Sequence, residues 1–410
     1  MNNANIDKSK ATLIGHTRMG KPVYCADDAR HVIVCGTNGS GKTVELFNHI
    51  ESAVKKNYGL LLVDGKGDTG KGSMLEAAIA FCEKYKRPLY VVNMNDPARS
   101  ARFNPFRGAT ETVAKDMLVN MTDWSEEHYK TNAERYIQRL VKLLNIAAVP
   151  LSFHSIIKHM AIDKFMDLSA ALQKRGLITK ENHLENLELI KASGKIAEQA
   201  AARFATIAES EVGQIFSEDG IDIYTALESG TVILFILNPL LFPETSAVMG
   251  RLVLIDAKKA VSKLFGKNKR SFFVMDEINV YASPVLVDLI NKSRSAGVTC
   301  ISAMQSLADL EAAAGTAFKS QIIENSNNYV VLRQNSFASA EEWAMTLGTY
   351  EKMEMTWKTS DLGANGEGSA RMVRAFHVHP DEIKAFKTGE GVFLSRDTGK
   401  CERIRIIKPF

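Results

Sequence analysis

The sequence predicts an α/β fold with a doubly wound, mostly parallel sheet and an inserted all-α domain. Three observations support this prediction. A complete phosphate-loop motif lies between an apolar run and a helical segment near the start of the chain. Short apolar segments then recur with helical stretches between them, as in sheets built from parallel strands. Finally, residues 110–216 contain no convincing strand.

The phosphate-loop motif matches G-x-x-x-x-G-K-[ST] without a mismatch. It reads Gly36-Thr37-Asn38-Gly39-Ser40-Gly41-Lys42-Thr43, after the apolar run 31–35 and before the helical segment 44–54. Glycines let the backbone wrap closely around phosphate, and the N–H groups and helix N-terminus supply positive potential. We expect Lys42 to reach the β- and γ-phosphates of ATP and Thr43 to coordinate Mg²⁺. A glycine-rich turn without a ligand is the alternative, which the strand–loop–helix context disfavours.

The predicted strands are short, and those that are apolar throughout are typical of strands buried on both faces. A closing hairpin is predicted at 391–396 and 402–407, and the glycine-rich stretch 361–369 is expected to be a flexible loop. The other predicted strands are 32–35, 60–64, 89–93, 232–237, 272–276, 298–303 and 329–333.

The long segment between the third and fourth of these strands is expected to be helical. Apolar residues recur at helical spacing in 132–144 and again in 196–207. The predicted domains are therefore 1–109, the first part of the nucleotide-binding domain; 110–216, the all-α inserted domain; and 217–410, its second part.

Composition sets broad limits on function. Hydrophobic residues make up 45% and charged residues 24% of the 410, which is ordinary for a globular protein. A net charge of +4 does not by itself indicate nucleic acid, so any DNA-binding surface must come from local placement of charge. The five cysteines form no C-x-x-C pattern and favour reduced thiols in a cytosolic protein. No signal peptide opens the chain, and the most apolar run, 231–243, is too short for a membrane span.

An apolar strand that ends in Asp276-Glu277 supplies the second half of an ATP site. Asp276 would hold the Mg²⁺ shell, and Glu277 would orient and deprotonate the attacking water. A strand that ends in two acids is weak evidence alone, but the phosphate loop upstream strengthens the interpretation. The glutamate favours hydrolysis, because a kinase would need a second substrate hydroxyl instead.

Three further polar residues each allow two interpretations. Gln305, after the strand 298–303, would contact the γ-phosphate and the water, or it would only cap the strand. Arg294, at the end of a predicted helix, would complement the helix dipole or act as an arginine finger in an adjoining subunit. Lys66, in the turn 64–68, would approach phosphate or DNA, or belong to a solvent turn.

Together these residues resemble the type IV secretion coupling proteins, the VirD4/TraG/TraD-like group of the FtsK–HerA class of P-loop ATPases. The resemblance covers nearly the whole chain, from about residue 13 to residue 407. Its most specific part is 292–297 followed by 303–306. The resemblance also rests on the phosphate loop and on the segments 64–68, 104–106, 220–235 and 275–277.

The resemblance implies a RecA-like motor domain that uses ATP and Mg²⁺ and assembles as a homo-oligomer, a hexameric ring. It identifies Arg294 with the family's arginine finger and Gln305 with its sensor glutamine. DNA is the implied substrate, with single strands favoured and contacted through phosphates regardless of sequence. The all-α domain would dock a relaxase, the relaxosome or secretion substrates. Type IV secretion ATPases or inner-membrane components are further implied partners.

The chain departs from the family at two points. The usual N-terminal transmembrane region is not seen, so we expect either a truncated chain or a soluble member held by partners at the cytoplasmic face of the bacterial inner membrane. Gly65 also stands where proline is common in relatives.

The predicted function is an ATP-hydrolysing DNA translocase or coupling protein that delivers conjugative DNA and attached protein to a type IV secretion channel. One alternative is an ATP-switched recruitment platform for secretion substrates, which the helical insert motivates. A chromosomal FtsK/HerA-like pump for double-stranded DNA is another, and the helical insert argues against it.

Overall fold

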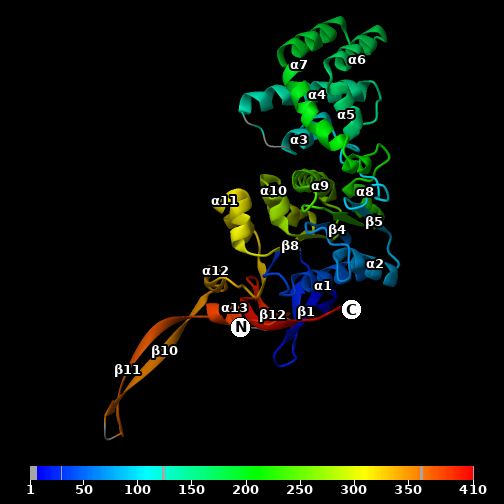
Figure 1. Cartoon of the computed structure of the whole chain (residues 1–410). Helices are drawn as coiled ribbons and strands as arrows, with labels where there is room; N and C mark the ends of the chain where they lie inside the picture. Colours follow the sequence, from blue (N-terminus) through cyan, green and yellow to red (C-terminus); the bar gives the residue numbers. More distant parts are fainter. Residues whose placement is uncertain (1–6, 29, 122–123, 125, 361–362, 410) are drawn as a thin grey trace. The chain divides into compact units, whose positions relative to one another are not determined.

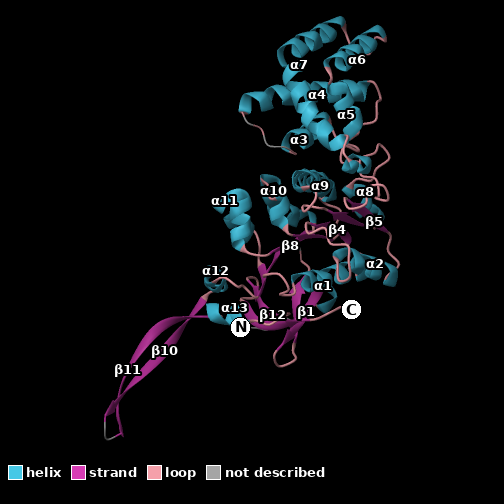
Figure 2. Ribbon diagram, viewed as in Figure 1, coloured by secondary structure: helices cyan, strands magenta, loops and turns pink. Residues whose placement is uncertain are grey.

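The computed structural model describes residues 7–28, 30–121, 124, 126–360 and 363–409 (Figures 1 and 2). It divides into two compact units. The first comprises Met1–His49 and Ser302–Phe410, and the second comprises Ile50–Ile301. Helix α1 (Lys42–Lys55) and strand β8 (Val298–Met304) each begin in one unit and end in the other.

The first unit contains a mixed sheet. Its pairings are antiparallel from β2 through to β9, and β9 pairs with β3 in parallel. Both β3 and β9 are buried along their whole length, as expected for strands covered on both faces. The strand order is β2 (Pro22–Ala26), β1 (Ala11–Thr17), β13 (Lys400–Ile406), β12 (Glu390–Ser395), β9 (Asn328–Leu332) and β3 (Val32–Cys35).

The predicted closing hairpin is confirmed as β12 and β13, which pair antiparallel. The helices of this unit lie mostly between its strands in the sequence. They are the 3-10 helix η1 (Lys8–Lys10), α11 (Leu307–Glu324), α12 (Phe337–Leu347) and α13 (Pro380–Ala385).

A long two-stranded ribbon extends from α12 and α13 (Figure 1). It consists of β10 (Thr349–Ser360) and β11 (Gly363–Phe376). The loop expected at 361–369 is therefore wrong from residue 363 onward, while residues 361–362 lie outside the described residues. The reason is cross-strand pairing, such as Thr356 with Ser369, which satisfies the backbone of a glycine-rich segment that composition alone assigns to a loop.

The second unit contains a parallel sheet. Strand β4 pairs with both β7 and β6, and β6 pairs with β5. The strands are β7 (Ser271–Asp276), β4 (Gly59–Asp64), β6 (Val232–Ile236) and β5 (Leu89–Asn93), close to the predicted ranges. The helices that accompany them are α2 (Met74–Lys84), α8 (Ile223–Ser229), α9 (Pro243–Leu264), η3 (Ile278–Tyr281), α10 (Pro284–Ser293) and η4 (Arg294–Ala296).

Helices follow one another from residue 111 to residue 215, and the residues described in this range form no strand. The two predicted helical segments are confirmed within α4 (Glu127–Ile146) and α7 (Lys180–Ala208). Tyr136 of α4 packs edge-to-face on Phe165 of α6 (Ile162–Lys174). The domain boundaries at 109/110 and 216/217 stay a prediction. The helices are α3 (Glu111–Asn120), α4 (Glu127–Ile146), α5 (Phe153–Met160), α6 (Ile162–Lys174), α7 (Lys180–Ala208) and η2 (Glu211–Ile215).

Among the helices in the described part of the chain, none is both long enough and apolar enough to cross a bilayer.

Candidate nucleotide-binding site

The phosphate loop begins where β3 ends, in the first unit, and strands on either side of β3 fix its start. The Gly36 N–H donates a hydrogen bond to the Met304 carbonyl oxygen (3.2 Å), at the end of β8. The Thr37 N–H donates to the Arg333 carbonyl oxygen (2.9 Å), just after β9. The loop therefore leaves the sheet at the carboxyl end of its parallel strands, where α/β proteins bind ligands.

The glycines of the motif are required by the backbone path. Gly39 and Gly41 have φ angles of +70° and +114°, in the region that favours glycine. Gly36 has an ordinary φ, but a Cβ there would lie 2.6 Å from the Leu332 Cβ and the Ser40 Oγ. The spacing of glycines thus reflects both conformation and close approach.

Lys42 and Thr43 begin helix α1 directly after the loop. The Lys42 side chain is only 7% exposed, and its Nζ donates a hydrogen bond to the Gly36 carbonyl oxygen (2.7 Å). The ammonium group is thus folded back over the loop, close to the helix N-terminus. Thr43 is half-buried in the first turn, where the motif requires the hydroxyl that coordinates Mg²⁺.

Gln305 lies in the same unit, at the end of β8 beside the phosphate loop. The Cys35 Sγ donates to the Gln305 carbonyl oxygen (3.5 Å), which brings the end of β8 next to the end of β3. The next helix, α11, is capped by Ser306, whose side chain accepts from the Asp309 N–H. Ser306 thus caps the helix and not the strand, and the role of Gln305 stays a prediction.

A segment from the far end of the chain supports the loop, and sequence reasoning missed it. The Thr388 hydroxyl donates to the Gly39 carbonyl oxygen (3.0 Å), and the Gly389 N–H donates to the Ser40 carbonyl oxygen (2.8 Å). Gly389 has a φ of +79°. A glycine two residues before a predicted strand is the only sequence signal of this contact, and it does not reveal the partner.

Asp276 and Glu277 lie in the second unit, where β7 ends as predicted. They are 4% and 8% exposed, and the Glu277 N–H donates to the Asp276 Oδ1 (3.0 Å). Glu277 has a φ of +47°, a conformation that is costly for a side chain larger than glycine. Such strained residues cluster at functional sites, because the surrounding structure must hold them in place.

The turn after β4 lies directly beside this acidic pair, since Asp64 and Asp276 are register partners. The Asp64 Oδ1 accepts hydrogen bonds from the N–H groups of Lys66 and Gly67, while burial raises the pKa of Asp64 to about 6. The Lys66 Nζ pairs with the Asp68 carboxylate (3.2 Å) on an exposed surface, which favours the solvent-turn interpretation of Lys66.

Arg294 follows α10 in the second unit and is exposed. Within the described part of the chain, its guanidinium makes neither a hydrogen bond nor a salt bridge. Gly297, with a φ of +75°, ends this segment. An exposed cation at a helix end suits either predicted role, and its action in another subunit stays a prediction.

The structure therefore groups the predicted residues in two sets. The first unit brings Gln305 to the phosphate loop with Lys42 and Thr43. The second unit holds Asp276, Glu277 and Arg294, with the first two beside the Asp64 turn.

Comparisons with known proteins identify the fold. Residues 18–394 match the family model of the type IV secretion-system coupling protein DNA-binding domain. The unbound coupling protein TrwBdeltaN70 superposes with a TM-score of 0.73 at 17% identity, covering 100% of this chain and 92% of that one. TrwB in complex with ADP and Mg²⁺ gives 0.65 at 16% identity, covering 100% and 93%.

Two further matches extend the comparison. VirB4 of Thermoanaerobacter pseudethanolicus gives a TM-score of 0.61 at 12% identity, covering 98% of both chains. An uncharacterized protein of Mycoplasma pneumoniae is 31% identical over 137 residues, which are 33% of this chain and 87% of that protein. The structural matches confirm the predicted RecA-like P-loop fold.

Proposed function

Because the chain belongs to the family of type IV secretion-system coupling proteins, we propose that it is an ATP-hydrolysing translocase for conjugative DNA. It would deliver DNA and attached protein to a type IV secretion channel. The observation that carries the proposal is the complete phosphate loop, held between β8 and β9 with Lys42 folded over it. Similar structures hold ADP with Mg²⁺, which supports ATP and Mg²⁺ as the ligands of this fold.

Each site residue has a chemical role in this proposal. Lys42 and the loop N–H groups would bind the β- and γ-phosphates, and the Thr43 hydroxyl and Asp276 carboxylate would hold the metal. Bound Mg²⁺ would neutralise charge that develops on the phosphates. Glu277 would orient the attacking water and accept its proton, and Gln305 would contact the water and the γ-phosphate.

Arg294 would complete the site of an adjoining copy of the chain. Its exposure and its lack of a partner among the described residues support this role, since an arginine finger must reach another subunit. The proposal therefore includes a ring-shaped homo-oligomer, a hexamer. Docking of a relaxase or secretion substrate on helices α3–α7, and location at the cytoplasmic face of the inner membrane, are further parts of it.

The test is the rate of ATP hydrolysis measured against protein concentration, with and without single-stranded DNA. A translocase that works as a ring should turn over ATP faster per subunit as concentration rises, and DNA should stimulate it. Slow turnover that is independent of DNA, together with tight binding of a protein substrate, would instead favour an ATP-switched recruitment platform. A full rate in an isolated monomer would contradict the role of Arg294.

A further inference from the structure

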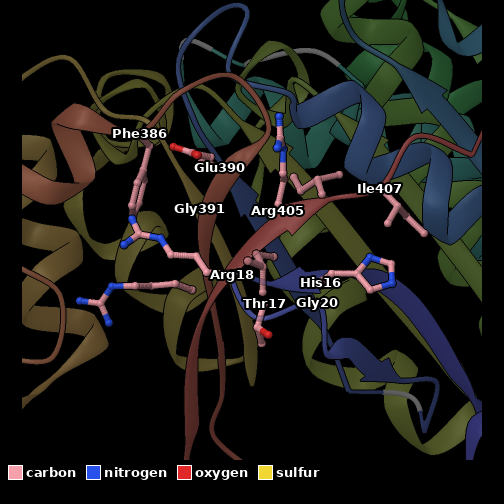
Figure 3. A pocket seen from close by; sticks show the side chains of 12 residues that line it. His16, Thr17, Arg18, Gly20, Phe386, Glu390, Gly391, Arg405 and Ile407 are labelled. Atoms are coloured by element: carbon pink, nitrogen blue, oxygen red, sulfur yellow. The ribbon is translucent and has the colours of Figure 1, made fainter.

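A cavity of about 470 Å³ lies on the antiparallel part of the first unit's sheet (Figure 3). Its walls come from β1 and the turn after it, from β13, and from the segment that leads into β12. The charged and aromatic residues among its lining are His16, Arg18, Phe386, Glu390, Arg403 and Arg405. Three guanidinium groups thus face one cavity that also contains a single carboxylate.

Strand register explains why these side chains gather. Arg405 is the register partner of His16 on one side and of Glu390 on the other, so the three residues form one row across β1, β13 and β12. Register partners project to the same face of a sheet, and Arg403, two residues before Arg405, projects to that face as well. The turn after β1 adds Arg18, which also lines the cavity.

The arginines differ in their bonding. The Arg403 guanidinium pairs with both carboxylate oxygens of Glu382, at 2.5 Å and 2.6 Å, and also donates to the His377 carbonyl oxygen. Arg18 and Arg405 are exposed, and their guanidinium groups make neither a hydrogen bond nor a salt bridge with any residue that the structure describes. Two planar groups with several N–H donors each are therefore available to an anion.

The charge and shape of the cavity narrow the class of anion. Glu390 offsets part of the charge of Arg18 and Arg405, which leaves about one positive charge, the complement of a phosphodiester rather than of a polyphosphate. Phe386 is only 4% exposed, so it offers no open ring face on which a base could stack. Contacts here would be made to the backbone of a nucleic acid and would not depend on its sequence.

The cavity also adjoins the support of the phosphate loop. Glu390 and Gly391 line it, and the two residues just before them, Thr388 and Gly389, make the hydrogen bonds to the carbonyl oxygens of Gly39 and Ser40. A ligand in the cavity would therefore contact residues directly after the two that hold the phosphate loop.

We propose that Arg18 and Arg405 form a site for the phosphodiester backbone of DNA, separate from the phosphate loop. The proposal rests on the proposed function in that DNA is the substrate, and it names residues that contact it. Each guanidinium donates hydrogen bonds to phosphate oxygens, and Glu390 disfavours more highly charged phosphates at the same place.

The test is binding of a fluorescently labelled single-stranded oligonucleotide of about 20 nucleotides, longer than the sites of single-strand binding modules. Anisotropy is measured against salt concentration for the full chain and for Arg18→Gln, Arg405→Gln and the double variant. Each substitution should reduce the magnitude of the slope of log affinity against log salt by about 0.7. Arg99→Gln is the matched control, since its side chain is 90% exposed and distant in the sequence, and it should leave the slope unchanged. Thermal unfolding of each variant checks that it folds.

The outcomes separate this site from the wider function. A double variant that keeps the affinity and slope of the unchanged protein overturns the site. Pyrophosphate, titrated into Lys42→Ala to remove binding at the loop, provides a second arm. Pyrophosphate binding that disappears with Arg405→Gln while DNA binding persists would overturn the DNA assignment in favour of a small phosphate ligand.

If the unchanged chain binds no DNA at all, the translocase proposal itself fails. If it binds DNA and hydrolyses ATP normally while the arginine variants match it, only the site fails.

Discussion

Gly65→Ala tests whether close backbone packing holds the acidic pair at the end of β7 in its working position. Gly65 follows β4, and its N–H donates a hydrogen bond to the Asp276 carbonyl oxygen (3.2 Å). A Cβ at this position would lie 2.7 Å from that oxygen and 2.9 Å from the Glu277 carbonyl oxygen. Ordinary contact begins at 3.4 Å, so the two strand ends must separate by roughly 0.7 Å, the difference between 3.4 and 2.7 Å.

That separation sets the size of the expected effect. Overpacking of this kind lowers stability by about 1–3 kcal/mol, and a misplacement of about 1 Å at a reacting group can reduce the rate about 100-fold. We therefore expect kcat for ATP hydrolysis to fall about 10- to 100-fold in Gly65→Ala, because Glu277 no longer aligns the water. The KM for ATP should change little, since the substitution leaves the phosphate loop intact.

The assay is steady-state ATP hydrolysis in the presence of single-stranded DNA, with thermal unfolding as the check on folding. Gly70→Ala is the matched control in the same turn, because a Cβ there meets only the Asp68 Oδ1, at 3.3 Å, and that side chain can rotate. If Gly65→Ala turns over ATP at the rate of Gly70→Ala, close packing does not position Glu277 and the reasoning is refuted.

Three other predictions concern catalysis and stability. Lys42→Ala and Arg294→Ala should each abolish ATP turnover. An equal mixture of the two variants should recover about a quarter of the original rate, because a site with intact Lys42 can receive Arg294 from a neighbouring subunit. Absence of recovery would contradict the action of Arg294 between subunits. Lys259→Met should lower the free energy of unfolding by about 3–5 kcal/mol in urea titrations at neutral pH, since it removes the cation 2.7 Å from the fully buried Asp256 carboxylate. The control is Lys258→Met, because Lys258 is half-buried and pairs with Asp288 instead; an equal effect of the two would refute this account. Burial raises the pKa of Asp256 from 3.8 to about 6, so the native state binds the proton more tightly than the unfolded chain and loses stability as pH rises through this range. The free energy of unfolding, relative to Asp256→Asn, should therefore fall by about 2 kcal/mol between about pH 4 and pH 7, and a difference that is flat with pH would show that the carboxyl titrates normally.

The parallel strands and the phosphate loop were predictable because their signals are local. A strand such as β4 or β7 is buried on both faces, so its sequence is an unbroken apolar run that stands out from its neighbours. The loop needs glycine at fixed positions for its backbone path, and the motif records those positions directly. The acidic pair was found for the same reason, since it directly follows one of these runs.

The elements that escaped prediction depend on pairing between distant segments. Strand β1 has mixed polarity and pairs with β13 near the other end of the chain, for example Gly15 with Ile406. The glycine-rich start of β11 is a strand only because β10 lies opposite. Neither segment has an apolar run or a clean alternation, so nothing within it distinguishes a strand from a loop.

The contact between the C-terminal segment and the phosphate loop suggests why that distant pairing matters for ATP. Thr388 and Gly389 donate to carbonyl oxygens of the loop, and Lys42 donates to another, that of Gly36. Donors from the C-terminal segment and from Lys42 itself thus hold the loop by its carbonyl groups, whereas an anion would be bound by its N–H groups. Because Thr388 and Gly389 directly precede β12, the antiparallel strands that close the first unit are joined to its phosphate loop by two hydrogen bonds. A change on those strands therefore has a direct structural route to nucleotide binding.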